Sequence, residues 1–391
     1  MELEAIYRTS IGLDVHQRQI TACAITLGPD GQLTAEHRQF GSFKRDRRAL
    51  AEWCASKAPD VVVMESTGIY WRSPYTALER AGIRALVVNA RHVKTVPGRK
   101  TDVGDAQWLA ILARSGLLTG SFIPPARFAE LRLIARQRHK LTGMLAAEKN
   151  RVHKILAHGG VRLSVVVSDL HGQSARRMVQ ALVDGLPPEQ VVKLAGKRLR
   201  APREEILEAL DSELSRSHRF VLSELLDHIE QIEVRLARFD QALLAELEPE
   251  HDILTLLQTL PGVDRIGAAM LLVEIGTDMA AFGSPGRLAS WAGICPGNHE
   301  SAGKRKSGKI RKGNAHLRRL LCEFAHAAAR TRCGLQAKYR SLAARMGNKR
   351  AIVALAHKLL RVIFFMLQPR DYLSLTWMPE APTLRGTSAL V

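Results

Sequence analysis

The order of apolar runs in the N-terminal part of the chain constrains its fold more than any other feature. Three strand-like runs lie between Ile6 and Phe43, and the Asp30-Gly31 pair predicts a hairpin turn between the second and third. Helical and short apolar segments then alternate, and a third helix opens near Lys100. This order predicts a mixed sheet with helices on its faces. The succession β-β-β-α-β-α-β-α matches the ribonuclease H type of fold.

The rest of the chain has mainly helical periodicity. Two series of positions, within 131–155 and within 222–243, recur at alternating steps of three and four residues, the average period of a coiled coil. The second series is apolar throughout, whereas Arg138 and Glu148 interrupt the first. This pattern fits two helices packed within one subunit as well as helices that associate between subunits. We predict a ribonuclease H-like α/β domain at 1–125, a helical dimerisation region at 126–250 with an insertion of unassigned role at 159–203, a mainly helical domain at 251–368 and a loosely ordered tail at 369–391.

The chain carries an excess of positive charge that a nucleic-acid partner would explain. It contains 57 Lys and Arg residues against 38 Asp and Glu residues, for a formal net charge of +19. In a chain with enough apolar residues to fill cores, this excess favours a nucleic-acid-binding protein, with a ribosome-associated or membrane-surface protein as the alternative. The apolar segment 352–367 contains Lys358 and Arg361 and is too short to span a membrane. We expect a cytoplasmic protein without a membrane partner.

Residues 256–319 combine a glycine turn with a basic, glycine-rich loop. The sequence LPGVDRIGA places Gly262 in a turn of the helix-hairpin-helix type, where backbone N–H groups can approach a phosphate. Between Pro296 and Arg319, eight basic residues oppose a single acidic residue, Glu300. Such a loop suits a phosphate backbone, because its side chains neutralise charge and its glycines allow close approach; a solvated surface loop is the alternative. The basic residues are Lys304, Arg305, Lys306, Lys309, Arg311, Lys312, Arg318 and Arg319.

Four acidic residues occupy positions from which their side chains can converge. Asp14 and Glu65 each end an apolar run, where a charge is costly unless it is satisfied or functional. The first and fourth strands of a ribonuclease H-like sheet are neighbours, so these two carboxylates would meet. Asp102 and Asp105 lie one helical turn apart and can face them, although such pairs also occur simply as N-terminal helix acids. Because four carboxylates repel one another when empty, we predict that they bind two Mg²⁺ ions for phosphodiester chemistry.

Four stretches of the sequence together resemble a known family. They read IGLDVH, VVVMESTGIYW, VPGRKTDVGDAQWLA and NHESAGKRKSGKIRKGN. In this order and spacing they are similar to the DEDD transposases of the IS-one-ten family of bacterial insertion sequences, also described as bridge-RNA-guided recombinases. The resemblance implies that Asp14, Glu65, Asp102 and Asp105 are the metal ligands of a RuvC-like domain. It also implies that Ser301 is the nucleophile of a C-terminal transposase domain and forms a covalent 5′-phosphoserine link to DNA.

The same resemblance implies partners and an assembly. In this family, the acidic tetrad and the serine of one active site come from different subunits of a tetramer, and a noncoding guide RNA pairs with donor and target DNA. The chain would therefore bind DNA and RNA and form dimers that assemble into tetramers on DNA, in association with the bacterial nucleoid. From the residues alone, Ser301 reads first as an ordinary loop serine, and Ser307 is its nearest rival. A serine hydroxyl needs activation, which the metal cluster would supply.

Two other functions remain open from the residues. A hydrolytic junction nuclease of RuvC type needs only the acidic tetrad, but it leaves the C-terminal domain with its serine unexplained. A noncatalytic nucleic-acid-binding scaffold accounts for the charge, but it gives no reason for Asp14 and Glu65 at the ends of strands. Covalent trapping on DNA separates the three, because only the recombinase forms an adduct.

Overall fold

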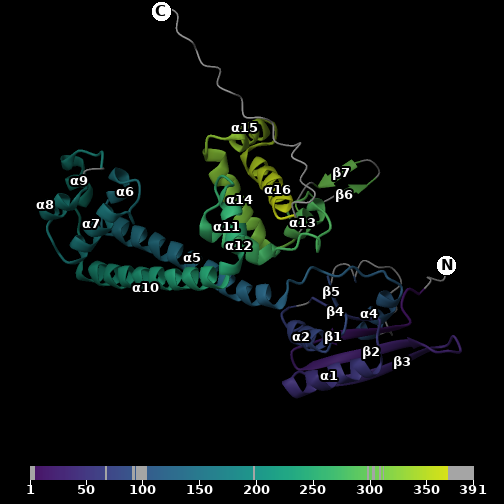
Figure 1. Cartoon of the computed structure of the whole chain (residues 1–391). Coiled ribbons are helices and arrows are strands. Elements are labelled where there is room, and N and C mark those ends of the chain that lie inside the picture. The colour runs from purple at the N-terminus through teal and green to yellow at the C-terminus, as the bar shows by residue number, and fades with distance from the viewer. Residues whose placement is uncertain are drawn as a thin grey trace, which may run out of the picture. The chain divides into compact units, whose positions relative to one another are not determined.

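The computed structural model describes residues 5–66, 68–89, 93, 104–196, 199–296, 299–301, 304–307, 310 and 312–368; Figure 1 shows the chain. The chain divides into two compact units, residues 1–123 and 124–391. The finer domain limits expected from the sequence stay predictions. Asp102, Lys309, Arg311 and the tail at 369–391 lie outside the described residues.

The first unit contains a five-stranded sheet in the order β3-β2-β1-β4-β5. β1 (Thr9–Val15) pairs antiparallel with β2 (Gln19–Leu27), which pairs antiparallel with β3 (Leu33–Gly41). On the other side, β4 (Val61–Glu65) pairs parallel with β1 and with β5 (Ala85–Val88). The prediction of a mixed sheet is confirmed, and the first and fourth strands are neighbours, as the ribonuclease H-like order requires.

Helices cover both faces of this sheet. α1 (Lys44–Ser56) and α2 (Arg72–Arg80) pack on one face and α4 (Asp105–Arg114) packs on the other. Alternate apolar residues of β1, β2 and β4 enter the core under α1 and α2, and residues between them lie under α4. Because successive side chains of a strand point to opposite faces, the continuous apolar run of β4 is buried on both sides of the sheet.

Two long antiparallel helices begin the second unit. α5 (Ala126–His158) and α10 (Arg216–Glu246) lie side by side (Figure 1). Arg138 pairs with Asp240 near one end, and Lys149 pairs with Glu233 at 3.1 Å further along. Both periodic apolar series bury residues within one chain, including Leu141, Val152, Leu222, Ile229 and Ile232. Of the two arrangements that the spacing allowed, the structure shows packing within one subunit.

The stretch at 159–203 folds into a small helical subdomain with the adjoining ends of α5 and α10. Its residues share one apolar core with those helices, in which Met178 and Leu222 are fully buried. Its role stays unassigned. The elements here are α6 (Leu163–Val166), α7 (Gln173–Val183), α8 (Pro188–Val191), η1 (Val192–Leu194) and α9 (Arg203–Leu210).

The remaining elements form a helical bundle and a short hairpin. β6 (His299–Ser301) and β7 (Lys304–Ser307) pair antiparallel. α16 contains most of the apolar segment 352–367 and buries its apolar face, and no helix within the described part of the chain is long and apolar enough to cross a membrane. The helical elements are η2 (Glu248–Glu250), α11 (His251–Gln258), α12 (Arg265–Ile275), α13 (Pro285–Ala292), α14 (Ala315–Arg330), α15 (Gly334–Met346) and α16 (Asn348–Met366).

Candidate active site

Asp14 and Glu65 lie at the same edge of the sheet, near the ends of neighbouring parallel strands. The register places Leu13 of β1 beside Met64 of β4, so the next pair along the strands is Asp14 and Glu65. Leu13 and Met64 belong to the core under α1 and α2. The two acidic side chains alternate with them and therefore lie on the face that α4 covers.

Gly12 allows α4 to lie directly on β1. A Cβ atom at Gly12 would lie 2.0 Å from the carbonyl oxygen of Ala106 and 2.6 Å from the backbone nitrogen of Ala110. Any side chain at this position would therefore push the helix off the sheet. The buried hydroxyl of Ser10 donates a hydrogen bond to the carbonyl oxygen of Ala110 at 2.9 Å and fixes the same contact. Sequence analysis did not single out Gly12, although a glycine inside a strand indicates close approach of another backbone.

The direction of α4 brings Asp105 to the end of β1 where Asp14 lies. The carbonyl of Ala106 faces Gly12, and one turn later the helix backbone contacts Ser10, two residues earlier in the strand. The helix therefore runs antiparallel to β1 and begins near the acidic edge. Asp105 is its first residue and is exposed. Three of the four predicted metal ligands thus come to one edge of the sheet.

The donor set at this edge suits a hard divalent ion. Its described members are all carboxylates, the ligands that Mg²⁺ and similar ions prefer. Among the residues that the structure describes, no three His, Cys, Asp or Glu side chains are grouped closely enough to hold a metal ion, and Asp102 lies outside these residues. Asp14 Oδ2 lies 3.1 Å from His16 Nε2, a neighbour that sequence analysis missed within IGLDVH. The complete ligand set stays a prediction.

The two candidate serines lie at opposite ends of the β6–β7 hairpin. The backbone of Ser301 pairs with that of Lys304 beside the turn, whereas Ser307 pairs with His299 at the other end. The first three basic residues of the predicted phosphate-binding loop therefore follow Ser301 directly across the turn and along β7. Lys312 is exposed after the hairpin.

Tight backbone packing fixes the chain where it leaves this hairpin. A Cβ atom at Gly313 would lie 2.4 Å from the nitrogen of Gly293 and 2.5 Å from the carbonyl oxygen of Trp291. The backbone N–H of Asn314 donates a hydrogen bond to the same Trp291 oxygen at 3.0 Å. The side chain of Asn314 caps α14 by accepting two N–H groups of its first turn, each at 3.1 Å. The end of the basic loop is thus held between α13 and α14.

A buried carboxylate supports the same connection. Glu274, near the end of α12, is only 3% exposed. It accepts hydrogen bonds from Arg136 at 2.9 and 3.0 Å and from the amide of Asn314 at 2.7 Å, and Arg132 lies 3.4 Å away. Burial alone would raise the pKa of Glu274, but the hydrogen bond from Arg136 and the charges of Arg132 and Arg136 lower the pKa below its usual value. Sequence analysis missed this network, whose one local signal is a glutamate in the apolar run MLLVEIG.

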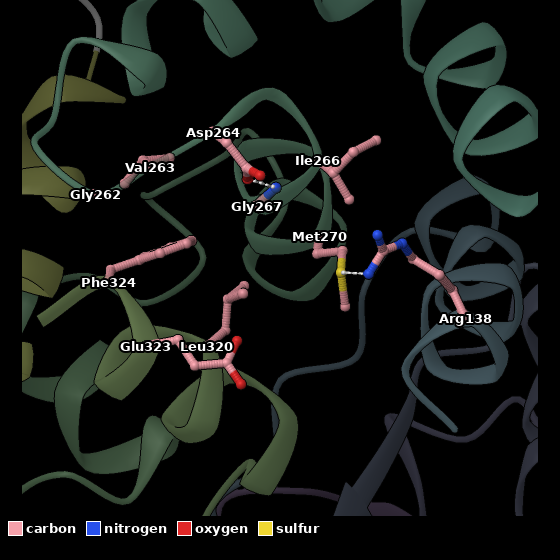
Figure 2. Close-up of a pocket in the computed structure, with 10 residues that line it drawn as sticks. All are labelled: Arg138, Gly262, Val263, Asp264, Ile266, Gly267, Met270, Leu320, Glu323 and Phe324. Carbon is pink, nitrogen blue, oxygen red and sulfur yellow. Dashed lines mark hydrogen bonds between the residues drawn. The ribbon is translucent and has the colours of Figure 1, made fainter. Parts of the chain in front are cut away.

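The glycine turn between α11 and α12 lines a pocket of about 480 Å³, into which Arg138 and Glu323 point from α5 and α14 (Figure 2). Gly262 has a φ of 90°, and a Cβ there would lie 2.8 Å from the carbonyl oxygen of Phe324. Asp264 accepts the N–H of Gly267 at 2.6 Å and so occupies the N-terminus of α12. Gly262 therefore has a packing role against α14, and its predicted phosphate contact stays a prediction.

Comparisons with known proteins match two separate stretches of the chain. A family model of DEDD transposases of IS110 type, described as "Transposase", matches residues 11–159, and a second, described as "Transposase IS116/IS110/IS902 family", matches residues 254–340. Together they cover more than half of the chain. The first range contains all four acidic residues of the predicted tetrad, and the second contains Gly262 and Ser301.

Two relatives that match most of the chain are named as a transposase or as an IS110 protein. A probable family 20 transposase of Pseudomonas aeruginosa is 26% identical over 82% of this chain and 88% of its own length. The insertion element IS110 43.6 kDa protein of Streptomyces coelicolor is 24% identical over 92% of this chain and 93% of its own length. The RuvC structure of Thermus thermophilus is 14% identical and covers 29% of this chain and 99% of its own, with a TM-score of 0.23, too low to add to the strand order. The chain belongs to the IS110 family of transposases, as its motifs predicted, and is a DNA transposase.

Proposed function

We propose that this transposase cuts and rejoins DNA with a metal-binding tetrad in its first unit and a nucleophilic serine in its second. The tetrad is Asp14, Glu65, Asp102 and Asp105, and the nucleophile is Ser301. The observation that supports the tetrad most is the convergence at one sheet edge. β1 and β4 bring two carboxylates side by side, and the contact at Gly12 starts α4 at the same edge.

The DEDD type of the matching model implies a divalent metal ion; its identity as Mg²⁺ and a number of two ions are our proposal. Bound ions would stabilise the charge that develops on the phosphate and on the leaving oxygen. The protein's own part is to present oxygen ligands from two strands and one helix. These elements are rigid, because the strands are buried on both faces and the helix is held against them.

Ser301 would attack the phosphorus of the DNA backbone through its Oγ. The phosphorus–oxygen bond to the 3′ side breaks, the serine proton ends on the released 3′ hydroxyl, and a 5′-phosphoserine ester remains. A 3′ hydroxyl from another DNA end can then displace the serine, so strands are rejoined without ATP. The pairing of Ser301 with Lys304 supports this role, because it puts the serine opposite the first residue of β7, a basic strand suited to a phosphate backbone.

The tetrad and the serine belong to different compact units, and we propose that each active site combines the tetrad of one subunit with the serine of another. Dimers would assemble into a tetramer on donor and target DNA. A noncoding guide RNA would select both DNAs by base pairing. The net charge of +19 supports binding of several nucleic-acid strands at once.

Covalent trapping tests the proposed nucleophile. Wild-type protein incubated with guide RNA, donor DNA and Mg²⁺ should form a protein–DNA adduct that survives denaturation. Ser301→Ala should form none while still binding DNA, and Ser307→Ala is the matched control that should keep the adduct. A mixture of Ser301→Ala and Asp102→Asn subunits should regain activity, because an intact serine and an intact tetrad can meet across subunits. An adduct that maps to another residue would refute the assignment.

A junction nuclease of RuvC type is the second candidate, which the acidic edge alone favours. Such an enzyme would use water as its nucleophile and would form no adduct. Its Ser301→Ala variant would cut junction DNA at the wild-type rate, so the same set of proteins distinguishes the two functions.

A further inference from the structure

The contact between α5 and α14 gathers four nitrogen-bearing side chains that the proposed chemistry does not use. Arg136 and His139 lie one turn apart on α5, and His316 and Arg319 lie one turn apart on α14. The two imidazole rings meet edge to face, with centroids 5.7 Å apart and planes at 88°. The guanidinium of Arg319 contacts Nε2 of His139. We call these four residues the α5–α14 cluster; each keeps part of its side chain exposed to solvent.

The carboxylates near the α5–α14 cluster already have cationic partners. Glu274 pairs with Arg136 and Arg132, and Glu323 accepts a hydrogen bond from Nε of Arg319 at 2.7 Å. Three guanidinium groups thus face two carboxylates, which leaves positive charge even while both histidines are neutral. The charged groups that face the two imidazoles are Arg132, Arg136, Arg138, Glu274, Arg319 and Glu323.

The two histidines can each add a positive charge to the α5–α14 cluster by taking up a proton. Burial lowers the pKa of His139, and the charge of Arg319 lowers it further. Burial likewise lowers the pKa of His316, and Arg136 adds to the effect. An anion against these rings would favour their protonated form and raise both pKa values again. Each ring can therefore gain a proton, and with it a charge, when an anion binds.

The α5–α14 cluster also follows directly on the basic loop in the chain. Asn314 caps α14 two residues after the exposed Lys312, and His316 is the second residue of that helix. The first turn of α14 adds the positive end of its dipole. Arg136 uses Nε and Nη2 on Glu274, and Arg319 uses Nε on Glu323 and Nη1 on His139. Each guanidinium has further N–H groups, which can donate to a phosphate oxygen.

We propose that the α5–α14 cluster binds a backbone phosphate of duplex DNA and takes up protons at His139 and His316 as it does so. The inference rests on the proposed function only in its choice of DNA as the partner. It requires neither the metal site nor Ser301. It adds to the basic loop a second phosphate contact whose strength depends on pH.

The pH dependence of DNA binding tests the proposal. Affinity for a short fluorescein-labelled duplex is measured by anisotropy at constant ionic strength, without divalent metal, from about pH 6 to about pH 8, a range that brackets the ordinary pKa of histidine. Wild-type affinity should rise as the pH falls, because the complex holds more protons than the free chain. Each proton taken up adds up to about tenfold in affinity per pH unit.

Matched variants locate the effect. The double variant His139→Gln/His316→Gln should bind about tenfold more weakly than wild type at about pH 6 and equally well at about pH 8. His357→Gln is the control, because His357 is a half-buried histidine of α16 whose pKa burial also lowers; it should keep the wild-type dependence. Arg319→Gln should reduce the slope of log affinity against log salt by about 0.9, the value of one phosphate contact.

Three results would overturn the proposal. The first is a pH dependence that survives unchanged in the double variant. The second is a pair of imidazole pKa values, measured by NMR, that do not rise when the duplex binds. The third is a histidine-dependent effect that occurs with structured RNA and not with duplex DNA. DNA binding is measured without metal, so these three results can be obtained even if Ser301 forms no adduct with DNA. The two proposals can therefore fail separately.

Discussion

The two compact units treat acidic side chains in opposite ways. In the helical unit, Glu274 is almost fully buried, and two arginines and an asparagine of the same chain balance and hydrogen-bond it. At the sheet edge, Asp14 keeps 30% of its side chain exposed, and within the described part of the chain it has a histidine contact and no arginine or lysine in salt-bridge distance. An acid balanced inside the chain stabilises the fold, whereas an acid at a strand end can take its counter-charge from a bound cation.

Residue type and local sequence do not distinguish the two kinds of acid. Glu65 ends the apolar run VVVME, and Glu274 lies in the equally apolar run MLLVEIG. The partner of Glu274 is not visible in its local sequence, because Arg136 reaches it across 138 residues.

The largest effect is expected at the sheet edge. Asp14→Asn, Glu65→Gln and Asp102→Asn should each reduce DNA cutting and joining in Mg²⁺ by several orders of magnitude, because each keeps the shape of the side chain and removes an anionic ligand. Their free energies of unfolding should change by less than about 1 kcal/mol or should increase, because each substitution removes one of the carboxylates that repel one another. Strand-transfer assays and denaturant unfolding measure the two effects. Wild-type activity in all three variants would show that the edge holds no catalytic metal.

The opposite outcome is expected for the buried acid. Glu274→Gln should lower the free energy of unfolding by about 3–5 kcal/mol, because the buried Arg132 and the half-buried Arg136 would then face a neutral amide. Glu323→Gln is the control, since this exposed acid in a surface pair with Arg319 should cost less than about 1 kcal/mol. Urea unfolding measures both. Equal stability of Glu274→Gln and wild type would show that the buried carboxylate does not stabilise the fold.

The difference in the free energy of unfolding between wild type and Glu274→Gln should depend on pH in a defined direction. The folded chain lowers the pKa of Glu274 below the ordinary value of 4.5. The stabilisation is therefore fully present above that value and is lost as the pH falls through the lower pKa of the folded state. The gap in stability between wild type and Glu274→Gln should shrink in that acidic range and stay constant near neutral pH.

Local patterns were enough to predict the sheet and the acidic residues at its edge. Apolar runs and a hairpin turn report on nearby residues, and the ribonuclease H-like order then predicted that Asp14 and Glu65 are neighbours. The pairing of α5 with α10 could not be settled, because a 3–4 spacing is the same for helices within one chain and between chains. Glu274 was missed because its partners are distant in sequence. Gly12 could have been identified, since a glycine inside an apolar strand indicates close approach of another backbone.

Gly12 tests whether the position of α4 matters to the acidic edge. Gly12→Ala should lower the free energy of unfolding by about 1–3 kcal/mol, because its Cβ would meet the helix backbone of α4. Activity should fall as well, since the displaced helix carries Asp105. Gly143→Ala is the matched control: Gly143 lies within α5 with open space around it, and alanine there should raise stability by up to about 1 kcal/mol. Wild-type stability and activity in Gly12→Ala would show that α4 does not hold the edge.

The smallest expected change concerns the basic hairpin, which should affect binding and leave folding unchanged. Replacing Lys304, Arg305 and Lys306 together by glutamine should reduce the slope of log affinity against log salt by about 2.7, because each phosphate contact on duplex DNA contributes about 0.9. The matched control replaces three exposed cations of α15, Lys338, Arg340 and Arg345. An equal loss in the control would mean that only net charge matters. An unchanged slope in the hairpin variant would place these side chains away from the phosphates, and the second unit would then bind DNA through other cations, among which the α5–α14 cluster is the first to examine.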